Sequence, residues 1–553
     1  MRRSAIDGRP PIGRSLAHLL RLSAMPVSAG KRGVRGSVGV ALLLALAGFL
    51  LLASSAGASS TSVARTLGGD ASTCPPIKNK PDSIPHVDYK GIKHNTYCVG
   101  PVNVRPGQNI IRLRRTDLFP HVPGYITRFD PELVLPDGTV PRVDVLHLHH
   151  AVWINNRYPQ FAVGEEKTIV QAPRGFGWRS VPSDEWALND MLHDLVGQPA
   201  QVYIVWRIDF IPDTAPAADN MRTIRTQWMD VAGSDAGVSN RLYPVFNSLR
   251  RYGKDGKYRF PDMAKGGQRD YIGPEQTWTP NHPVTLIETA GHLHPGGLNT
   301  SLRVRRGNQA NKIFTSKAHY YEPAGAVSWD VAMGGTPRDW RVKLKAGDEL
   351  SVHATYDASR ADWYEVMGIM PVAVYDGTDV GGVGALSNRI PQNNVLTHGH
   401  LSENRHHGGG ETDAYRDPLK LPDGPFATGP VNIKGYVYTP GDLNSGLPRS
   451  TSKPPTIHAG QSLTFKNLDD AQSRTWHTLT SCKAPCNRDT GVAYPIANGP
   501  RTFDSGQLGT NPPFGAPAIG KITWETPKKL DPGTYAYFCR VHPFMRGSFR
   551  VKR

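Results

Sequence analysis

The sequence lacks the motifs of several common enzyme classes. It contains no nucleotide-binding glycine loop, no Ser/His/Asp arrangement and no carboxylate pair of the kind that glycosidases use. Basic helices, RNA-binding signatures and zinc-finger spacings are also missing, although the formal net charge is +17. Residues 1–58 carry 8 Lys/Arg and one Asp, which is +7 of that charge. The other +10 lies on residues 59–553. It indicates a solvated cationic surface, and we expect no nucleic-acid partner.

Cysteine is scarce, with 5 residues in a chain of 553. An odd number suits an exported chain if four cysteines are paired and one is held by a metal ion. The economical local pairs are Cys74 with Cys98 and Cys482 with Cys486, which leaves Cys539 for the metal. The alternative is that Cys482 and Cys486 are themselves metal ligands, because they form a Cys-x3-Cys pair close to a histidine.

One apolar run, residues 38–53, is long enough to direct targeting. Three basic residues precede it, and an Ala-x-Ala site that ends at Ala58 follows it. This order predicts an export signal over residues 1–58, cleaved after Ala58. The run is slightly short for a membrane span, and an uncleaved N-terminal anchor is the alternative. We therefore expect a secreted, periplasmic or cell-surface protein whose membrane contact, if any, is this segment.

Glycine and proline are plentiful, and short β-branched or aromatic runs alternate with turn signals such as Pro136-Asp-Gly138. This pattern favours β-sandwiches over βαβ units, and the length suits about three domains. We expect an all-β chain with a signal at 1–58, a tether at 59–81, sandwiches at 82–230 and 231–380, a Gly/His/Pro-rich connector at 381–428 and a last sandwich at 429–553.

The C-terminal run carries a thiolate, an imidazole and a thioether at Cys539, His542 and Met545. A thiolate and imidazoles in trigonal geometry, with a weak axial Met, are the ligands of a blue copper electron-transfer site. Such a site needs one more imidazole, and His477 supplies it after a strand-like run. The alternative is a buried cysteine and a packing methionine in an all-β domain.

At these residues the chain resembles a cupredoxin, the plastocyanin and amicyanin family. The short loop from Cys539 to Met545 is most similar to amicyanin, and the resemblance covers about residues 429–553. It implies a Greek-key β-sandwich that binds one type 1 copper ion.

Two earlier runs place imidazoles on predicted strands. In the first, alternation puts His147 and His149 on one face and His150 on the other, although a twist could bring His149 and His150 to one ion. Three imidazoles in an apolar strand are costly to bury without partners. In the second run, His292 and His294 share one face.

Met367 lies about 75 residues after this second pair. Together with His292 and His294 it makes a softer ligand set, which suits cycling between Cu(I) and Cu(II). Over about residues 90–380 the chain resembles the copper type II, ascorbate-dependent monooxygenases, the family of peptidylglycine alpha-hydroxylating and dopamine beta-monooxygenase. The resemblance implies two copper sites, each in its own jelly-roll-like sandwich. His149 and His150 match ligands of one site. His292, His294 and Met367 match the ligands of the other.

The first of these sites lacks the third histidine that the family has on a later strand. The corresponding run here, residues 201–210, contains no histidine. His193 is the nearest substitute, in a segment (184–193) that could be helical, and His147 is a second candidate. The alternative for all these histidines is a structural role, in which the imidazoles are hydrogen-bonded and bind no metal.

Together these features predict an exported copper oxidoreductase. The C-terminal domain would take electrons from an external donor, a protein or an ascorbate-like reductant. It would pass them to one or two type 2 coppers, where a C–H bond of a small molecule or peptide is hydroxylated with dioxygen. The alternative is a non-catalytic blue copper electron carrier or a copper-handling protein. A multicopper oxidase ranks last, because the sequence shows one cupredoxin signature.

Overall fold

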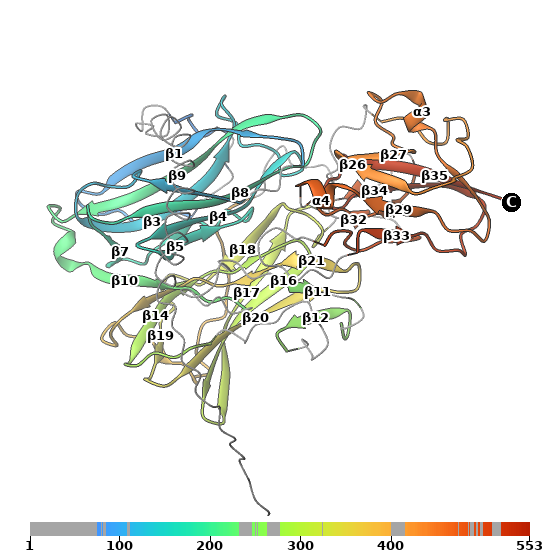
Figure 1. The fold of residues 1–553 in the computed structure, drawn as a ribbon. Coiled ribbons are helices and arrows are strands. Elements are labelled where there is room, and N and C mark those ends of the chain that lie inside the picture. The colour runs from blue at the N-terminus through green and yellow to red at the C-terminus, as the bar shows by residue number, and fades with distance from the viewer. Residues whose placement is uncertain are drawn as a thin grey trace, which may run out of the picture. The chain divides into compact units, whose positions relative to one another are not determined.

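The computed structural model describes residues 74–78, 80, 84–107, 111–231, 246–248, 250, 253–262, 277–322, 325–399, 415–473, 475–484, 486, 492–493, 496–497, 501–510 and 521–553. This part of the chain is almost entirely β, as the sequence predicts (Figure 1). The expected signal lies outside it. Within it, no helix is both long and apolar enough to cross a membrane.

The first sandwich packs two sheets face to face (Figure 1). One has the order β1-β9-β3-β7-β10, and the other has the order β2-β8-β4-β5. Both faces contribute large side chains to one core, in which Phe129 stacks on Phe161 with ring centroids 4.3 Å apart. The strands are β1 (Lys93–Val104), β2 (Ile111–Thr116), β3 (Gly124–Val134), β4 (Leu146–Asn155), β5 (Tyr158–Val163), β6 (Val170–Gln171), β7 (Phe176–Ser180), β8 (Trp186–Asp194), β9 (Ala200–Pro212) and β10 (Arg222–Gln227).

The segment 184–193, for which a helix was an open alternative, contains most of β8 instead. β8 pairs antiparallel with both β2 and β4, so its backbone donors and acceptors are satisfied on two sides. Its apolar residues Leu188 and Leu192 are buried in the sandwich core. Tertiary pairing has therefore overridden a helix propensity that was local and weak.

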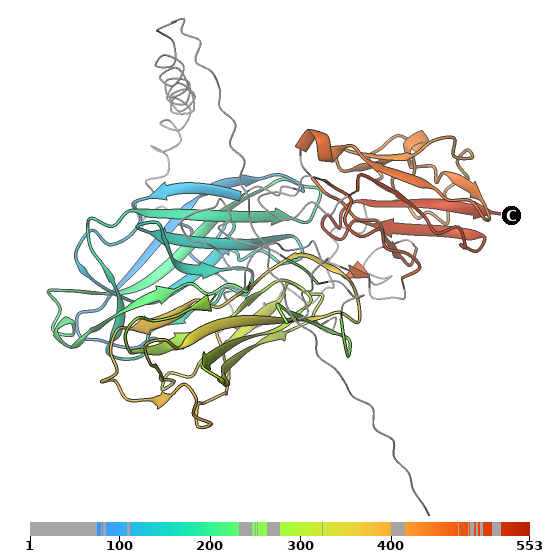
Figure 2. The ribbon, with the colours of Figure 1, turned by 60° about the horizontal axis from the view of Figure 1, so that its bottom comes forward.

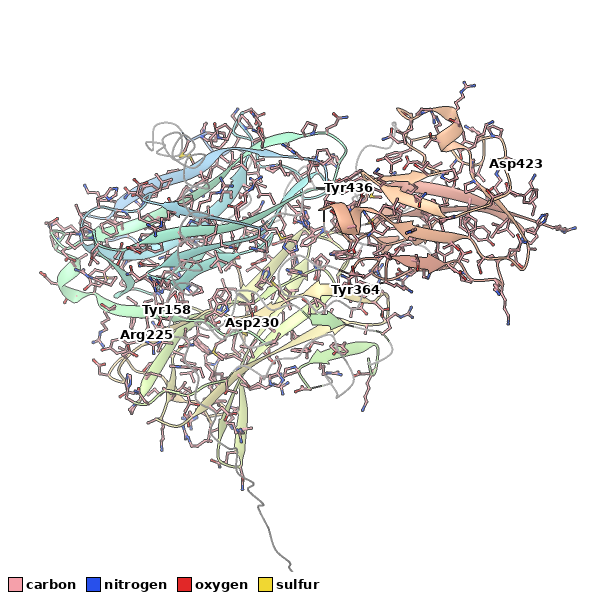
Figure 3. All side chains as sticks on the ribbon, viewed as in Figure 1. Tyr158, Arg225, Asp230, Tyr364, Asp423 and Tyr436 are labelled. Atoms are coloured by element: carbon pink, nitrogen blue, oxygen red, sulfur yellow. A yellow bond between two sulfur atoms is a disulfide. The ribbon has the colours of Figure 1, made fainter. Side chains whose placement is uncertain are left out.

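The second sandwich shares a sheet with the first. β10 pairs with β7 and also with β23, so one sheet continues as β23-β14-β19-β24. Arg225 of β10, labelled in Figure 3, also forms an ion pair with Asp376, with Nε 3.2 Å from Oδ2. The opposing sheet has the order β12-β20-β16-β17-β18-β25. The strands are β11 (Phe246–Ser248), β12 (Lys257–Phe260), β13 (Thr277–Trp278), β14 (Val284–Thr289), β15 (His292–Leu293), β16 (Gly297–Arg306), β17 (Gln309–Tyr320), β18 (Val331–Gly335), β19 (Val342–Leu344), β20 (Glu349–Asp357), β21 (Trp363–Val366), β22 (Gly368–Ile369) and β23 (Val372–Tyr375).

The expected connector, 381–428, begins with regular structure. β24 (Val383–Gly384) pairs with β19, and β25 (Val395–Leu396) pairs with β18. The first part of this segment thus adds edge strands to the second sandwich, although its glycines and prolines suggested a segment too irregular for a sheet. Residues 400–414 lie outside the described part.

The C-terminal region forms a separate pair of four-stranded sheets, with the orders β27-β26-β29-β33 and β28-β35-β34-β30. Figure 2 shows these strands gathered in two layers. The elements are β26 (Val431–Lys434), β27 (Val437–Thr439), α3 (Arg449–Ser452), β28 (Thr456–His458), β29 (Thr464–Asn467), α4 (Asp469–Ser473), β30 (Thr480–Cys482), β31 (Val492–Ala493), β32 (Ile496–Ala497), β33 (Thr523–Glu525), β34 (Gly533–Phe538) and β35 (Arg546–Lys552).

Both expected disulfides form. Cys74 is bonded to Cys98 of β1, and Cys482 of β30 is bonded to Cys486. Cys482 and Cys486 are therefore joined to each other, and the alternative in which they bind metal is not what the structure shows. Cys539 is buried and is not disulfide-bonded.

Candidate metal centre

Three buried side chains converge at one end of the C-terminal sandwich. Cys539 and His542 lie in the loop between β34 and β35, and His477 follows α4. The Cys539 Sγ is 3.8 Å from the His477 Nδ1 and 3.6 Å from the His542 Nδ1, and the two nitrogens are 3.1 Å apart. Because metal–nitrogen and metal–sulfur bonds measure about 2.0–2.3 Å, these spacings suit three ligands of a single ion.

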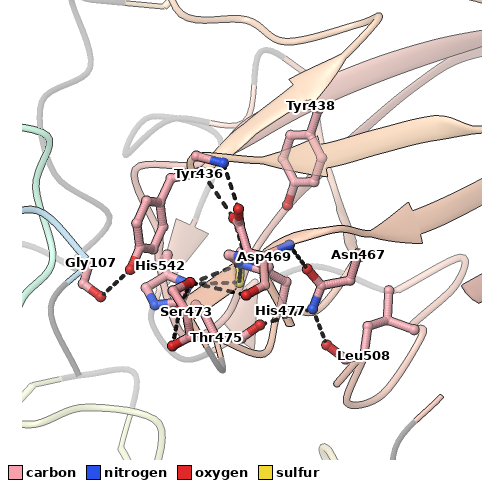
Figure 4. Close-up of polar contacts among 12 residues, drawn as sticks. Gly107, Tyr436, Tyr438, Asn467, Asp469, Ser473, Thr475, His477, Leu508 and His542 are labelled. Atoms are coloured by element: carbon pink, nitrogen blue, oxygen red, sulfur yellow. Dashed lines mark hydrogen bonds and ion pairs between the residues drawn. The ribbon is translucent and has the colours of Figure 1, made fainter. Parts of the chain in front are cut away.

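The His477 ring is held by a carboxylate that the sequence analysis missed. The Asp469 Oδ2 lies 3.0 Å from the His477 Nε2, as Figure 4 shows. A proton on Nε2 leaves the Nδ1 lone pair facing Cys539. Asp469 is itself fixed, because its two oxygens accept the backbone N–H groups of Gly435 (2.6 Å) and Tyr436 (3.1 Å).

The surroundings of Cys539 favour the thiolate form of its side chain. Burial alone would raise the pKa of its thiol, but hydrogen bonds and charge interactions with His477 and His542 bring the pKa well below its ordinary value. The Thr478 backbone N–H also donates to the sulfur at 3.3 Å. The thiolate is the form that binds metals.

Met545 is brought back towards Cys539 by the backbone of the ligand loop. The Met545 N–H donates to the His542 carbonyl at 2.8 Å, and the Cys539 N–H donates to the Met545 carbonyl at 3.1 Å. The Met545 side chain is buried in the same core cluster as Cys539. The structure thus brings His477, Cys539 and His542 together, and Met545 is buried in the same core as Cys539.

Replacing Asp469 with Ala is expected to lower the copper affinity of the C-terminal domain by about 10- to 100-fold, because the His477 ring loses the group that orients it. A competition titration against a copper chelator measures the change. Asp470→Ala is the matched control, because the Asp470 carboxylate bonds Thr510 rather than a ligand. Equal affinities for the two variants would show that Asp469 does not position His477.

The histidines of the two sandwiches also gather, and we call His147, His149, His150, His193, His292 and His294 the histidine cluster. A β-bulge explains how His149 and His150 meet: the register of β4 against β8 shifts between Leu148 and His150. The two Nδ1 atoms are 3.4 Å apart. The His150 Nε2 lies 3.1 Å from the Asn189 Oδ1, so its proton sits there and Nδ1 carries the lone pair.

His149 joins the two sandwiches. Its ring centroid is 4.6 Å from that of His193 and 4.5 Å from that of His294. His147 lies near the start of β4, and its ring stacks on that of Trp329 with centroids 4.1 Å apart. The expectation of one separate site per sandwich therefore differs from the structure, in which histidines of both sandwiches are ring neighbours.

His292 is oriented by a second carboxylate that the sequence analysis missed. The His292 Nδ1 is 3.0 Å from both oxygens of Glu166, which also accepts the Gly164 N–H at 2.8 Å. Gly164 permits this approach, because a Cβ there would lie 2.5 Å from the His292 ring. Among the described residues, the buried His292 Nε2 has no hydrogen-bond partner, which suits a metal ligand.

Met367 lies at a cavity that borders this group. Its side chain packs with Val152, Trp228 and Ile369, and it lines a cavity together with His150 and His292. Of the predicted set, His292 and Met367 line the same cavity, and the ring centroids of His292 and His294 are 5.3 Å apart.

Within the described ranges, two groups bring three His, Cys, Asp or Glu ligand atoms within 4.8 Å of one another. One is the triad of His477, Cys539 and His542. The other is a surface group in which His86 and His94 each approach one oxygen of the buried Asp209, at 2.6 and 2.7 Å. The histidine cluster is more open than either group.

Contacts tie the C-terminal domain to both sandwiches. The Arg540 Nη1 donates to the Asp362 carbonyl at 2.7 Å, and its guanidinium lies over the Tyr364 ring, labelled in Figure 3. The Tyr436 hydroxyl, beside the triad in Figure 4, donates to the Gly107 carbonyl at 2.9 Å. Burial lowers the pKa of His193 to about 3, and the charge of His542 contributes to this shift.

No protein-family model matches the chain, and no curated protein matches it significantly. Among solved structures it is similar to the Cu(I) form of a mutant amicyanin, with 19% identity over 26% of this chain and 94% of that chain and a TM-score of 0.12. It is also similar to the Cu-containing nitrite reductase NirK from Thermus scotoductus, with 13% identity over 48% of this chain and 55% of that chain and a TM-score of 0.14. Both TM-scores are low, so the assignment of function rests on the residues described above.

Proposed function

We propose that residues 429–553 bind one copper ion through His477, Cys539, His542 and Met545 and that this domain transfers electrons. The observation that carries the proposal is the buried triad, with donor atoms 3.1–3.8 Å apart. Two imidazoles, a thiolate and a thioether form the ligand set of a blue copper site. Copper bound there would supply one-electron redox chemistry.

The protein around this site favours electron transfer over substrate chemistry. All three residues of the triad are buried, so water and substrate are kept away from the donor atoms. Asp469 and the Thr478 N–H fix the ring of His477 and the sulfur of Cys539. A site with its ligands held in this way has no open position for a reacting molecule.

The second part of the proposal assigns the histidine cluster and Met367 to one or two type 2 copper ions and to the hydroxylation of a C–H bond. Copper there would supply the activation of dioxygen. The reaction balances when R–H, O2, two electrons and two protons give R–OH and water. An external donor, a protein or an ascorbate-like reductant, would supply the electrons through the C-terminal domain. His292 supports this assignment, because Glu166 orients its ring and its Nε2 is buried without a hydrogen-bond partner among the described residues.

Transfer between the two centres is supported by contacts of the ligand loop. Arg540, directly after Cys539, is bonded to Asp362 of the second sandwich. The charge of His542 also contributes to the lowered pKa of His193 in the first sandwich. We therefore propose that electrons pass from Cys539 through His542 towards His193.

A second candidate function is an exported electron carrier or copper-handling protein without catalysis. The openness of the histidine cluster favours it, because no three of its ligand atoms lie within 4.8 Å of one another in the described structure. Looser sites of this kind suit storage or delivery of copper.

Replacing Met367 with Ala is expected to weaken Cu(I) binding at the sandwiches by about tenfold or more, because a thioether is a soft ligand that prefers Cu(I). A competition titration with a Cu(I) chelator measures this. Met370→Ala is the control, since Met370 is also buried but belongs to the core of the second sandwich. An unchanged Cu(I) affinity in Met367→Ala would remove Met367 from the proposed site.

A further inference from the structure

A cavity of about 330 Å³ lies beside the histidine cluster, between strands of the first and second sandwiches. Aliphatic and aromatic side chains dominate its wall, among them Val152, Phe161, Trp178 and Ile369. A cavity of about 150 Å³ holds one benzene ring. This cavity therefore has room for a molecule of about two fused rings.

Several polar side chains on the wall are hydrogen-bonded within the protein, whereas the buried Thr168 Oγ1, Thr397 Oγ1 and His292 Nε2 have no hydrogen-bond partner among the described residues. The Gln160 Nε2 and the Trp178 Nε1 both donate to the Thr226 Oγ1, at 3.0 and 3.1 Å, and the Thr226 hydroxyl donates to the Gln160 carbonyl at 2.8 Å. The Thr289 hydroxyl donates to the Pro371 carbonyl at 2.8 Å. A ligand with its own donors or acceptors would leave them unpaired in this part of the cavity, which costs free energy.

The cavity wall also includes side chains with redox or acid–base chemistry. His150, His292, Met367 and Glu166 all line it, and the Glu166 carboxylate lies 3.0 Å from the His292 Nδ1. A molecule held in the cavity would therefore lie against residues to which the proposed function assigns copper.

We propose that the cavity binds a small, neutral, apolar molecule of about two fused rings, and that molecules of this class are the substrates of the hydroxylation. The binding depends on the cavity alone. The assignment as substrate rests on the proposed function.

The test uses naphthalene as the probe and the purified full chain without copper. Trp178 and Trp228 line the cavity, so tryptophan fluorescence reports occupancy. We expect saturable binding of naphthalene and at least about tenfold weaker binding of naphthalene-2-carboxylate, because burying its charge is costly. The absence of saturable binding, or equal binding of the carboxylate, would overturn the proposal.

Variants localise the binding. Ala162→Phe places a ring in the cavity and should weaken naphthalene binding at least about tenfold. Ala310→Phe adds the same ring at an exposed position of β17 and should leave binding unchanged. Val170→Trp, from another part of the wall, replaces Ala162→Phe if that variant fails to fold. Binding that neither wall variant weakens would show that naphthalene binds elsewhere.

The copper-loaded protein separates the two halves of the proposal. With a reductant and dioxygen, formation of a naphthol is expected. Binding without any naphthol would overturn the assignment as substrate while the binding site stands. Failure of naphthalene to bind would overturn the proposed binding site. It would not test the copper sites, which copper analysis measures separately.

Discussion

Replacing Cys539 with Ser is expected to abolish the strong visible colour of the copper-loaded protein. The colour of a blue copper site depends on a bound thiolate, and a serine hydroxyl does not ionise to take its place. Serine is close to cysteine in size, so the buried loop should keep its backbone hydrogen bonds. Copper held by the sandwiches should remain, which absorption spectra and copper analysis of the same sample would show.

The control for this change is the double variant Cys74→Ser and Cys98→Ser. It removes two cysteines of the first sandwich, which are bonded to each other, and should leave the colour intact. Colour that persists in Cys539→Ser, or that is lost in the control while the protein stays folded, would contradict the type 1 assignment.

The second large effect is expected for His193→Ala. If electrons leave the blue site through His542 and the histidine cluster, re-oxidation of the reduced blue site by dioxygen should slow by about tenfold or more. The blue spectrum should not change, because His193 is not one of the four proposed ligands. Stopped-flow mixing of the reduced protein with oxygenated buffer, followed by the blue absorbance, measures the rate.

His121→Ala serves as the comparison, because His121 is an exposed histidine of the first sandwich outside the cluster. It should re-oxidise at the rate of the unaltered protein. A rate for His193→Ala that matches this control would exclude His193 from the route.

The C-terminal site could be predicted because most of its chemistry is local in the sequence. Cys539, His542 and Met545 lie within one loop, and a lone upstream histidine completes the set. Asp469 was missed, although it lies only eight positions before His477. Its role depends on how α4 and the β26–β27 turn place its oxygens, and an acidic residue in a polar segment carries no signal of that.

The arrangement of the histidine cluster could not be predicted, because it depends on distant pairings. The bulge at His149 is set by β8, and the approach of His294 to His149 follows from the sheet that β10 and β23 join. Glu166 lies 126 positions from His292, so no spacing rule connects them. Alternation along one strand identified the histidines but not their neighbours.

The most direct test of the whole account is the copper content of the oxidised protein, measured by elemental analysis together with electron paramagnetic resonance. We expect about three copper ions per chain, one with a type 1 spectrum and two with type 2 spectra. A single copper ion with the type 1 signal alone would contradict the catalytic role of the sandwiches and leave an electron carrier. The absence of a type 1 signal would contradict the copper assignment at Cys539 itself.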